Sequence, residues 1–241
     1  MTVTNLTVRN PWFSSNGDGI DLESCRYVYI GQSTFDVGDD AICFKSGKNA
    51  EGRLLSIPTQ DVIVEDCTVY HGHGGFVIGS EMSGGVKNIQ IARCNFIGTD
   101  VGLRFKSCRG RGGKVEEIYI HDIIMKDISN EAILFSTAYN LQVKDTSICT
   151  QEDIPEFCHI YMNDVVCNGA KTAIALSGLP EQAIHHIGFK NVKLRAEKGI
   201  SCAFCHDLTF SNVNVFSETD STLHYHSGKL TKIDGDFKTD F

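Results

Sequence analysis

Three aspartates and a histidine fall at matching places in successive repeats of this sequence. An apolar-x-apolar triplet recurs along the chain, and Asp18 lies ten residues after the triplet that ends at Val8. Asp39 and Asp40 lie nine and ten residues after the next triplet, and His73 lies nine residues after the third. Equal offsets within a repeating chain predict that these side chains share one corner of neighbouring repeats.

Carboxyl groups that lie this close cannot all ionise freely, so one of them is expected to have a raised pKa and to remain protonated. A protonated carboxyl that donates to a leaving oxygen, beside a carboxylate that activates water, is the pair that glycoside hydrolysis uses, and a separation of roughly 6.5 to 9.5 Å predicts inversion. Arg104 and Lys106 follow the triplet that ends at Ile91 and add two cations to this side. The simpler interpretation, an Asx turn at each aspartate, fits one such residue better than three in register.

The triplets themselves indicate the fold that must position these residues. They end at Val8, Ile30, Val64, Ile91, Ile120, Met162, Phe189 and Phe210. A second apolar run begins about twelve residues after most of them, at Ile20, Ile42, Phe76, Leu103 and Ile133. Strand-like runs at this period, without an amphipathic helical pattern, predict an all-β protein, a right-handed single-stranded parallel β-helix of about eight coils. Residues at one offset would then form ladders with a spacing of roughly 4.8 Å.

The whole chain of 241 residues, with 41% hydrophobic residues, is predicted to form a single β-helix domain over residues 1–241. The longer intervals predict loops at 47–60 and 139–157. Residues 228–241 are expected to form a C-terminal tail or cap. No comparable cap precedes Val3, so N-terminal coils are expected to be missing.

Bulk properties exclude some partners. The net charge of −8 disfavours nucleic acid, no apolar run reaches the roughly 20 residues of a membrane span, and the first residues show no signal peptide. The ten cysteines are expected to be buried free thiols rather than disulfides. Residues 202–206, CAFCH, match a c-type haem signature, which chance explains better. No closed zinc site is predicted from the spacing of His71, His73, His185 and His186.

Four segments in the same order resemble the signature blocks of family 28 glycoside hydrolases, the polygalacturonases. They are NGDGID (16–21), GDDAICFKSG (38–47), GHGGFVIGSEMSGGV (72–86) and LRFK (103–106). The resemblance covers roughly residues 3–140 and is closest to bacterial exo-acting members, through GSEMSGGV and RGRGG (109–113). It implies that Asp39 is the general acid, that Asp18 and Asp40 together hold the attacking water, and that His73 orients the acid.

The same resemblance implies a binding set for the substrate. Arg104 and Lys106 would bind the carboxylate of a galacturonate unit, and Asn16 and Tyr139 would contact the substrate. Gly17 replaces the threonine that is usual in the first block. A basic segment continues from this set and contains Lys106, Arg109, Arg111 and Lys114. It predicts either a binding surface for a polyuronate or a solvated loop.

The function that the resemblance implies is inverting, exo-acting cleavage of α-1,4-galacturonosyl linkages in pectin or polygalacturonate, without a metal or organic cofactor. The substrate would be a pectic polysaccharide or oligogalacturonate, handled by a monomer outside the cytoplasm, secreted or periplasmic. A rhamnogalacturonan or xylogalacturonan hydrolase is the nearest alternative. A Ca²⁺-dependent pectate lyase and a non-catalytic carbohydrate-binding β-helix, inactive because coils are missing, are the others.

Overall fold

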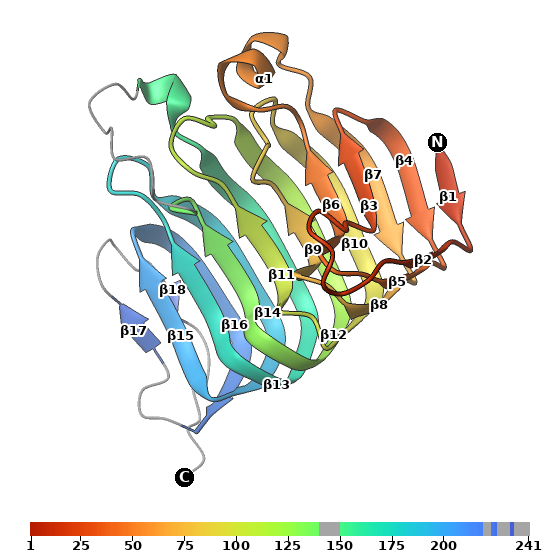
Figure 1. Cartoon of the computed structure of the whole chain (residues 1–241). Coiled ribbons are helices and arrows are strands. Elements are labelled where there is room, and N and C mark those ends of the chain that lie inside the picture. The colour runs from red at the N-terminus through yellow and green to blue at the C-terminus, as the bar shows by residue number, and fades with distance from the viewer. Residues whose placement is uncertain (140–149, 219–222, 226–231, 234–241) are drawn as a thin grey trace.

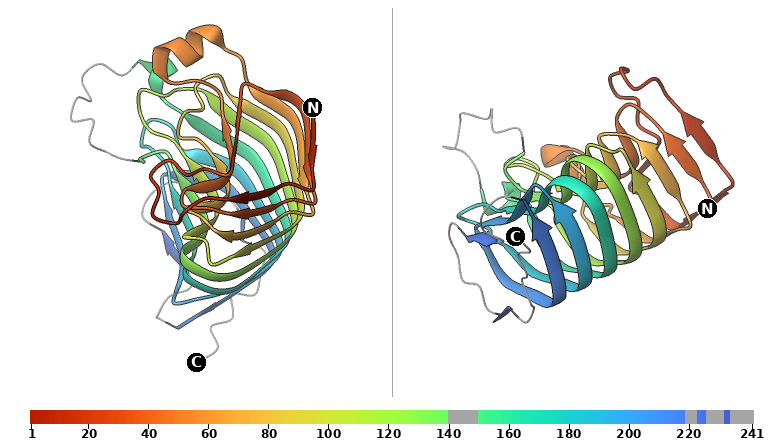
Figure 2. Two further views of the ribbon diagram at one scale, coloured as in Figure 1. Left: turned by 45° about the vertical axis from the view of Figure 1, so that its right-hand side comes forward. Right: turned by 90° about the horizontal axis from the view of Figure 1, so that it is seen from below.

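A computed structural model describes residues 1–139, 150–218, 223–225 and 232–233 of the protein. The chain winds into stacked coils, and the strands of successive coils join in one 18-stranded parallel sheet. Figure 1 shows the coils in chain order from the N-terminal to the C-terminal end, and the right-hand view of Figure 2 shows the stack end to end. The predicted parallel β-helix is confirmed.

The N-terminal half holds eleven strands, most of them short. They are β1 (Thr2–Thr4), β2 (Thr7–Arg9), β3 (Ile20–Glu23), β4 (Arg26–Gly31), β5 (Thr34–Asp36), β6 (Asp40–Lys45), β7 (Thr59–Glu65), β8 (Thr68–His71), β9 (Gly74–Ile78), β10 (Val86–Ile97) and β11 (Val101–Lys106). In the C-terminal half, four strands of 13 to 23 residues run around corners, namely β12 (Lys114–Ser136), β13 (Glu156–Ser177), β14 (Ile184–Ala196) and β16 (Cys205–Ser217). The other described strands there are short, namely β15 (Lys198–Ala203), β17 (Leu223–Tyr225) and β18 (Lys232–Ile233).

The predicted ladders are present, with one correction in the first coil. Ile30 stacks on Val3, whereas Val8 stacks on Phe35, one strand further along the coil. The prediction that Val8 begins the triplet ladder was therefore wrong. Its LTV motif is a triplet of the neighbouring face, and an apolar alternation does not reveal which face of a coil a strand occupies. The second apolar run is confirmed as one ladder, from Ile20 through Ile133.

Two bends per coil fix where each triplet begins and ends. Paired residues five positions apart adopt left-handed backbone conformations, with φ between 50° and 57°, on either side of the triplet. They are Tyr27 and Gln32, Asp61 and Asp66, Asn88 and Arg93, Glu117 and Asp122, His159 and Asp164, His186 and Asn191, and Asp207 and Asn212. Most are polar, and Asn and Asp tolerate this conformation best among residues with a β-carbon. These paired corners bend successive coils at the same two positions, which keeps the coils stacked in register.

Stacked aromatic side chains fill the interior. Phe44, Phe76 and Phe105 are fully buried on neighbouring strands, and the ring centroids of Phe105 and Phe135 lie 4.3 Å apart in a parallel stack. Burying each such side chain stabilises the fold by about 1.5 to 3 kcal/mol. Because side chains alternate along a strand, this ladder of inward residues turns their neighbours outward, and Cys43 and Arg104 are among them.

The predicted loops differ in detail from the structure. Residues 47–60 contain a helix, α1 (Asn49–Leu55), whose end is marked by Ser56 in the left-handed conformation with its N–H bonded to the Gly52 carbonyl. The second region contains a 3₁₀ turn, η2 (Gln151–Asp153), while 140–149 lie outside the described residues. Most of the predicted tail or cap, 228–241, also lies outside them. Within it, β18 pairs with β16.

The nine cysteines in the described ranges are free thiols, as predicted, and all but Cys25 and Cys108 are buried. Cys202 and Cys205, which fit the haem signature, are both fully buried in the stack, so neither thiol faces solvent where haem could attach. Among the described residues, the helices are too short or too polar to cross a membrane.

Candidate active site

The three aspartates predicted to share a corner do meet there. The Gly19 N–H donates to the Asp40 carbonyl, and the His73 N–H donates to the Asp39 carbonyl, so the three coils are stacked in register at this turn. One carboxylate oxygen from each of Asp18, Asp39 and Asp40 lies within 4.8 Å of the other two. Asp18 reaches this corner through a longer connection between β2 and β3, and not through the equal offset from Val8 that the sequence suggested.

Asp39 is held by two hydrogen bonds to the same oxygen. His73 Nδ1 lies 3.0 Å from Asp39 Oδ1, and the Asp40 backbone N–H donates to that oxygen at 2.9 Å. The other imidazole nitrogen of His73 lies 4.0 Å from a carboxylate oxygen of Asp100. The contact predicted between His73 and Asp39 is therefore present. Because both of these hydrogen bonds go to Oδ1, the other carboxylate oxygen, Oδ2, remains available to another partner in the described structure.

Asp40 forms a buried ion triad with the two predicted cations. Its side chain is 3% exposed, and it accepts from Arg104 Nη1 at 3.2 Å and from Lys106 Nζ at 2.6 Å. The family resemblance assigned Arg104 and Lys106 to a carboxylate of the substrate, and in the structure both cations pair with Asp40. Arg104 Nε is buried and has no partner among the described residues, so an incoming carboxylate would meet the guanidinium at its terminal nitrogens.

Tyr139 lies beside the same cations. The guanidinium carbon of Arg104 is 5.6 Å from the centre of the Tyr139 ring, and Lys106 Nζ is 5.3 Å from it. These are cation–π distances. The structure therefore brings Tyr139 to the site, although its position in the sequence carried no tight motif.

The pKa of the Asp18 carboxyl is raised above its ordinary value. Burial is the main cause, and the charges of Asp21, Asp39 and Asp40 add to it, while Lys45 opposes it. Lys45 Nζ lies 3.3 Å from Asp18 and 2.8 Å from Asp21. Lys45 was not predicted as a site residue, although it lies inside the GDDAICFKSG segment. It is the register partner of Glu23 on the preceding coil. The side-chain alternation along β6 was the signal that could have found it.

Comparison with known proteins decides the family. The family model for glycosyl hydrolases family 28 matches residues 1–228. The chain belongs to this family. It is 26% identical over 98% of its length to an exo-poly-α-D-galacturonosidase of Dickeya chrysanthemi, of which it covers 40%, and 30% identical over 81% to an endo-polygalacturonase of Pectobacterium parmentieri, of which it covers 44%.

Solved structures agree with this family assignment. An exopolygalacturonase from Thermotoga maritima superposes with a TM-score of 0.82 at 29% identity, over 92% of this chain and 48% of that one. The chain thus spans less than half the length of these family 28 relatives. The three aspartates, His73, Arg104 and Lys106 all lie within the matched residues.

The separation of roughly 6.5 to 9.5 Å that predicts inversion refers to whole carboxyl groups. The approach of one oxygen from each aspartate to within 4.8 Å of the others is a different quantity, so inversion stays a prediction.

A divalent cation is disfavoured among these carboxylates. Their oxygens are close enough to share an ion, but Asp40 is already paired with two cations and Asp18 with Lys45. A metal ion placed there would meet three positive side chains within the same cluster. This geometry opposes the Ca²⁺ chemistry of a lyase.

The other predicted binding residues have less defined surroundings. Asn16 is exposed in the connection before Asp18, with φ of 56°. The four cations of the basic segment are each paired with a carboxylate, namely Asp40, Glu181, Glu81 and Glu116, so a polyuronate would compete with these carboxylates for them. A pocket of about 270 Å³ next to the acid is lined by Trp12, His71, His73 and Asp100, among others, and offers room for a sugar ring.

Proposed function

We propose that this chain hydrolyses α-1,4-galacturonosyl linkages of pectin or polygalacturonate, from the chain end and with inversion, outside the cytoplasm. The observation that supports the proposal best is the single corner where Asp18, Asp39 and Asp40 meet. Its chemistry needs no metal or organic cofactor, because the acid and the base are both side chains. The endo- and exo-acting names of the relatives are consistent with galacturonan as the substrate class.

In the proposed reaction, Asp39 Oδ2 donates a proton to the glycosidic oxygen. His73 and the Asp40 N–H hold Oδ1 and so orient the carboxyl. Asp18 and Asp40 hold the water that attacks the anomeric carbon. The water gives its proton to Asp18, so this carboxylate must be ionised before attack, although its environment raises its pKa.

Substrate recognition is assigned to the cations. Arg104 offers the terminal nitrogens of its guanidinium to the carboxylate of a galacturonate unit, and Lys106, which binds the same Asp40 carboxylate, is close enough to share that charge. The Tyr139 ring covers both. The nearest alternative substrates are a rhamnogalacturonan and a xylogalacturonan, since only rim contacts distinguish them from galacturonan.

The decisive experiment compares Asp39→Asn with wild type on polygalacturonate in the presence of a chelator. Wild type should release saturated reducing ends, and Asp39→Asn should lower kcat by at least about a hundredfold, the typical contribution of a general acid. Asp122→Asn is the matched control, because Asp122 is a corner residue whose left-handed conformation asparagine also accepts. Full activity of Asp39→Asn would falsify the assignment of the acid.

Product analysis separates the alternatives. Release of monomer from the chain end indicates exo action, and proton NMR of the first anomer formed tests inversion. Chelator-sensitive, unsaturated products would identify a lyase instead. Binding of oligogalacturonate by wild type without turnover would identify a non-catalytic β-helix, and parallel assays on rhamnogalacturonan and xylogalacturonan test the nearest alternative.

A further inference from the structure

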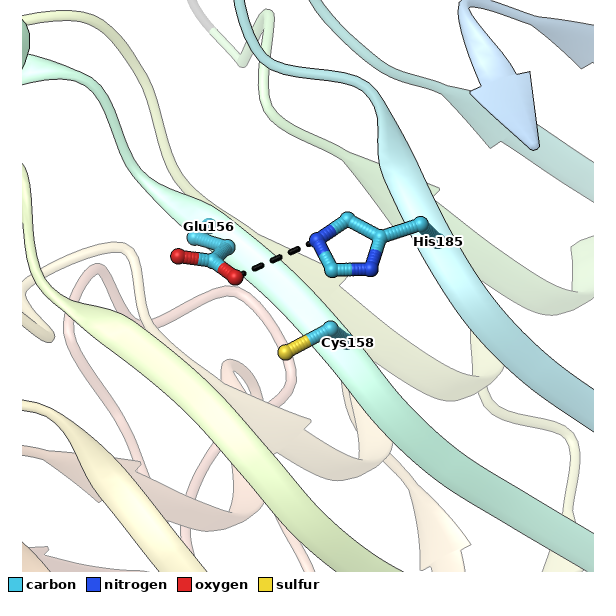
Figure 3. A group of neighbouring side chains, drawn as sticks. All are labelled: Glu156, Cys158 and His185. Carbon is cyan, nitrogen blue, oxygen red and sulfur yellow. Dashed lines mark hydrogen bonds and ion pairs between the residues drawn. The ribbon is translucent and has the colours of Figure 1, made fainter. Parts of the chain in front are cut away.

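Three potential metal ligands converge on β13 and β14, outside the carboxylate site. Glu156 and Cys158 are two residues apart on a strand, so both turn away from the core face that Phe157 occupies. Cys158 is the register partner of His185 on the next coil. Figure 3 shows the Glu156 carboxylate and the His185 ring turned toward each other, with Cys158 beside them. His185 Nε2 lies 3.1 Å from Glu156 Oε1.

We propose that Glu156, Cys158 and His185 bind a divalent transition-metal ion of the zinc class, with water as the fourth ligand. The three donor atoms all lie within 4.8 Å of one another. Bond lengths of about 2.0 to 2.3 Å at tetrahedral angles place such donors about 3.3 to 3.7 Å apart, so small side-chain rotations complete the site. A sulfur, nitrogen and oxygen set suits Zn²⁺ or Co²⁺ and disfavours Mg²⁺ and Ca²⁺.

The imidazole of His185 is already oriented for this role. Its Nδ1 lies 2.7 Å from Nδ1 of His186, and its ring stacks on His206 with centroids 5.0 Å apart and an interplanar angle of 6°. Nε2 is therefore directed at Glu156. Burial, the largest cause, lowers the pKa of His185, which favours the neutral form that ligates metals. A hydrogen-bonded second nitrogen is the usual support of a ligating histidine.

Two features oppose binding and make the site testable. Burial, followed by the charge of Glu156, raises the pKa of Cys158 to about 12, so without metal the residue is a thiol. Formation of the metal–sulfur bond must release this proton to solvent. Lys114 lies 3.7 Å from Glu156 and 2.8 Å from Glu116, and its positive charge repels a dication.

The sequence excluded His185 because its spacing from other histidines does not match a closed zinc site. Such spacing rules describe ligands supplied by one or two local loops. In a solenoid, Cys158 and His185 stand one whole coil apart in sequence and yet side by side in register.

Metal binding can be tested on the full chain without any glycosidase assay. The protein is treated with a chelator, dialysed and titrated with Co²⁺, and one equivalent should produce a thiolate-to-cobalt charge-transfer band. Competition with a chromogenic chelator then measures Zn²⁺ affinity. Cys158→Ser should abolish the band and weaken Zn²⁺ binding by more than about tenfold, and His185→Asn should weaken it similarly.

Cys167→Ser is the matched control, because Cys167 is a buried thiol of the same strand outside the cluster, and it should bind Co²⁺ as wild type does. Lys114→Gln should bind Zn²⁺ several times more tightly, which tests the proposal even if the Cys158 variant fails to fold. The absence of a charge-transfer band in wild type, an unchanged band in Cys158→Ser, or unchanged Zn²⁺ affinity in Lys114→Gln would each overturn the proposal.

Discussion

Asp18 and Asp40 are neighbours, yet replacing each by asparagine should change the stability of the protein in opposite directions. Asp40 is almost fully buried and lies between Arg104 and Lys106, so Asp40→Asn leaves two largely buried cations without their counter-ion. Asp18 has a raised pKa, chiefly because of burial, so its ionised form is penalised in the folded state. Asparagine keeps the shape of either side chain and removes only the charge.

The expected loss for Asp40→Asn is large. Removing one partner of a buried ion pair typically costs about 3 to 5 kcal/mol, because the remaining charge stays uncompensated. For a chain of this size, about 2 to 4 °C in Tm corresponds to 1 kcal/mol, which predicts a fall of about 6 to 20 °C. The double variant Asp40→Asn, Lys106→Met should recover part of this loss, since only Arg104 is then left without its counter-ion.

The gain for Asp18→Asn should depend on pH in a defined way. A carboxyl with a raised folded-state pKa adds stability below its unfolded value, and this stability is lost as the pH rises through the folded value. At neutral pH Asp18 is therefore destabilising, and Asp18→Asn should raise Tm. Below the ordinary carboxyl value of 3.8, wild type is protonated in both states and the advantage should vanish.

Thermal unfolding of both variants at pH 7 and at acidic pH tests the reasoning. Circular dichroism must first show native strand content in each variant. An unchanged or higher Tm for Asp40→Asn at pH 7 would show that the triad is not a stabilising arrangement of charges. A lower Tm for Asp18→Asn at neutral pH would refute the assignment of burial as the dominant effect on that carboxyl.

Three further substitutions have defined outcomes. Lys45→Gln removes the charge that lowers the pKa of Asp18, so the acidic limb of the pH profile of kcat/KM should move to higher pH. An unmoved limb would show that Asp18 is not the group that activates the water. Phe105→Ala opens a cavity within the aromatic stack and should cost about 3 to 5 kcal/mol in urea unfolding, whereas a cost below 1 kcal/mol would show that the stack collapses to fill it. Arg104→Lys keeps a positive charge near Asp40 but loses the planar guanidinium that can form two parallel hydrogen bonds to a carboxylate. KM for polygalacturonate should therefore rise while Tm changes little, and an unchanged KM would exclude Arg104 from substrate binding.

Much of the fold could be predicted from sequence because a solenoid repeats its own register. The ladder from Ile20 through Ile42 and Phe76 was predicted correctly, since a slip of one residue would turn these side chains out of the core. The first coil was predicted incorrectly because alternation does not show which face of a coil a strand occupies. Strands on different faces of one coil share the same alternation, so Val8 could not be distinguished from Val3 before its neighbour was known.

By itself, the sequence determined the repeat, the family resemblance and which aspartates meet at one corner, because those depend on residue types at regular intervals. Only the tertiary structure decided how the charges pair. The ion triad of Asp40 with Arg104 and Lys106, and the support that Lys45 gives Asp18, depend on side-chain reach across coils. The convergence of Cys158 with His185 likewise depends on which coils stack, because contacts between distant residues follow register in space and not separation along the chain.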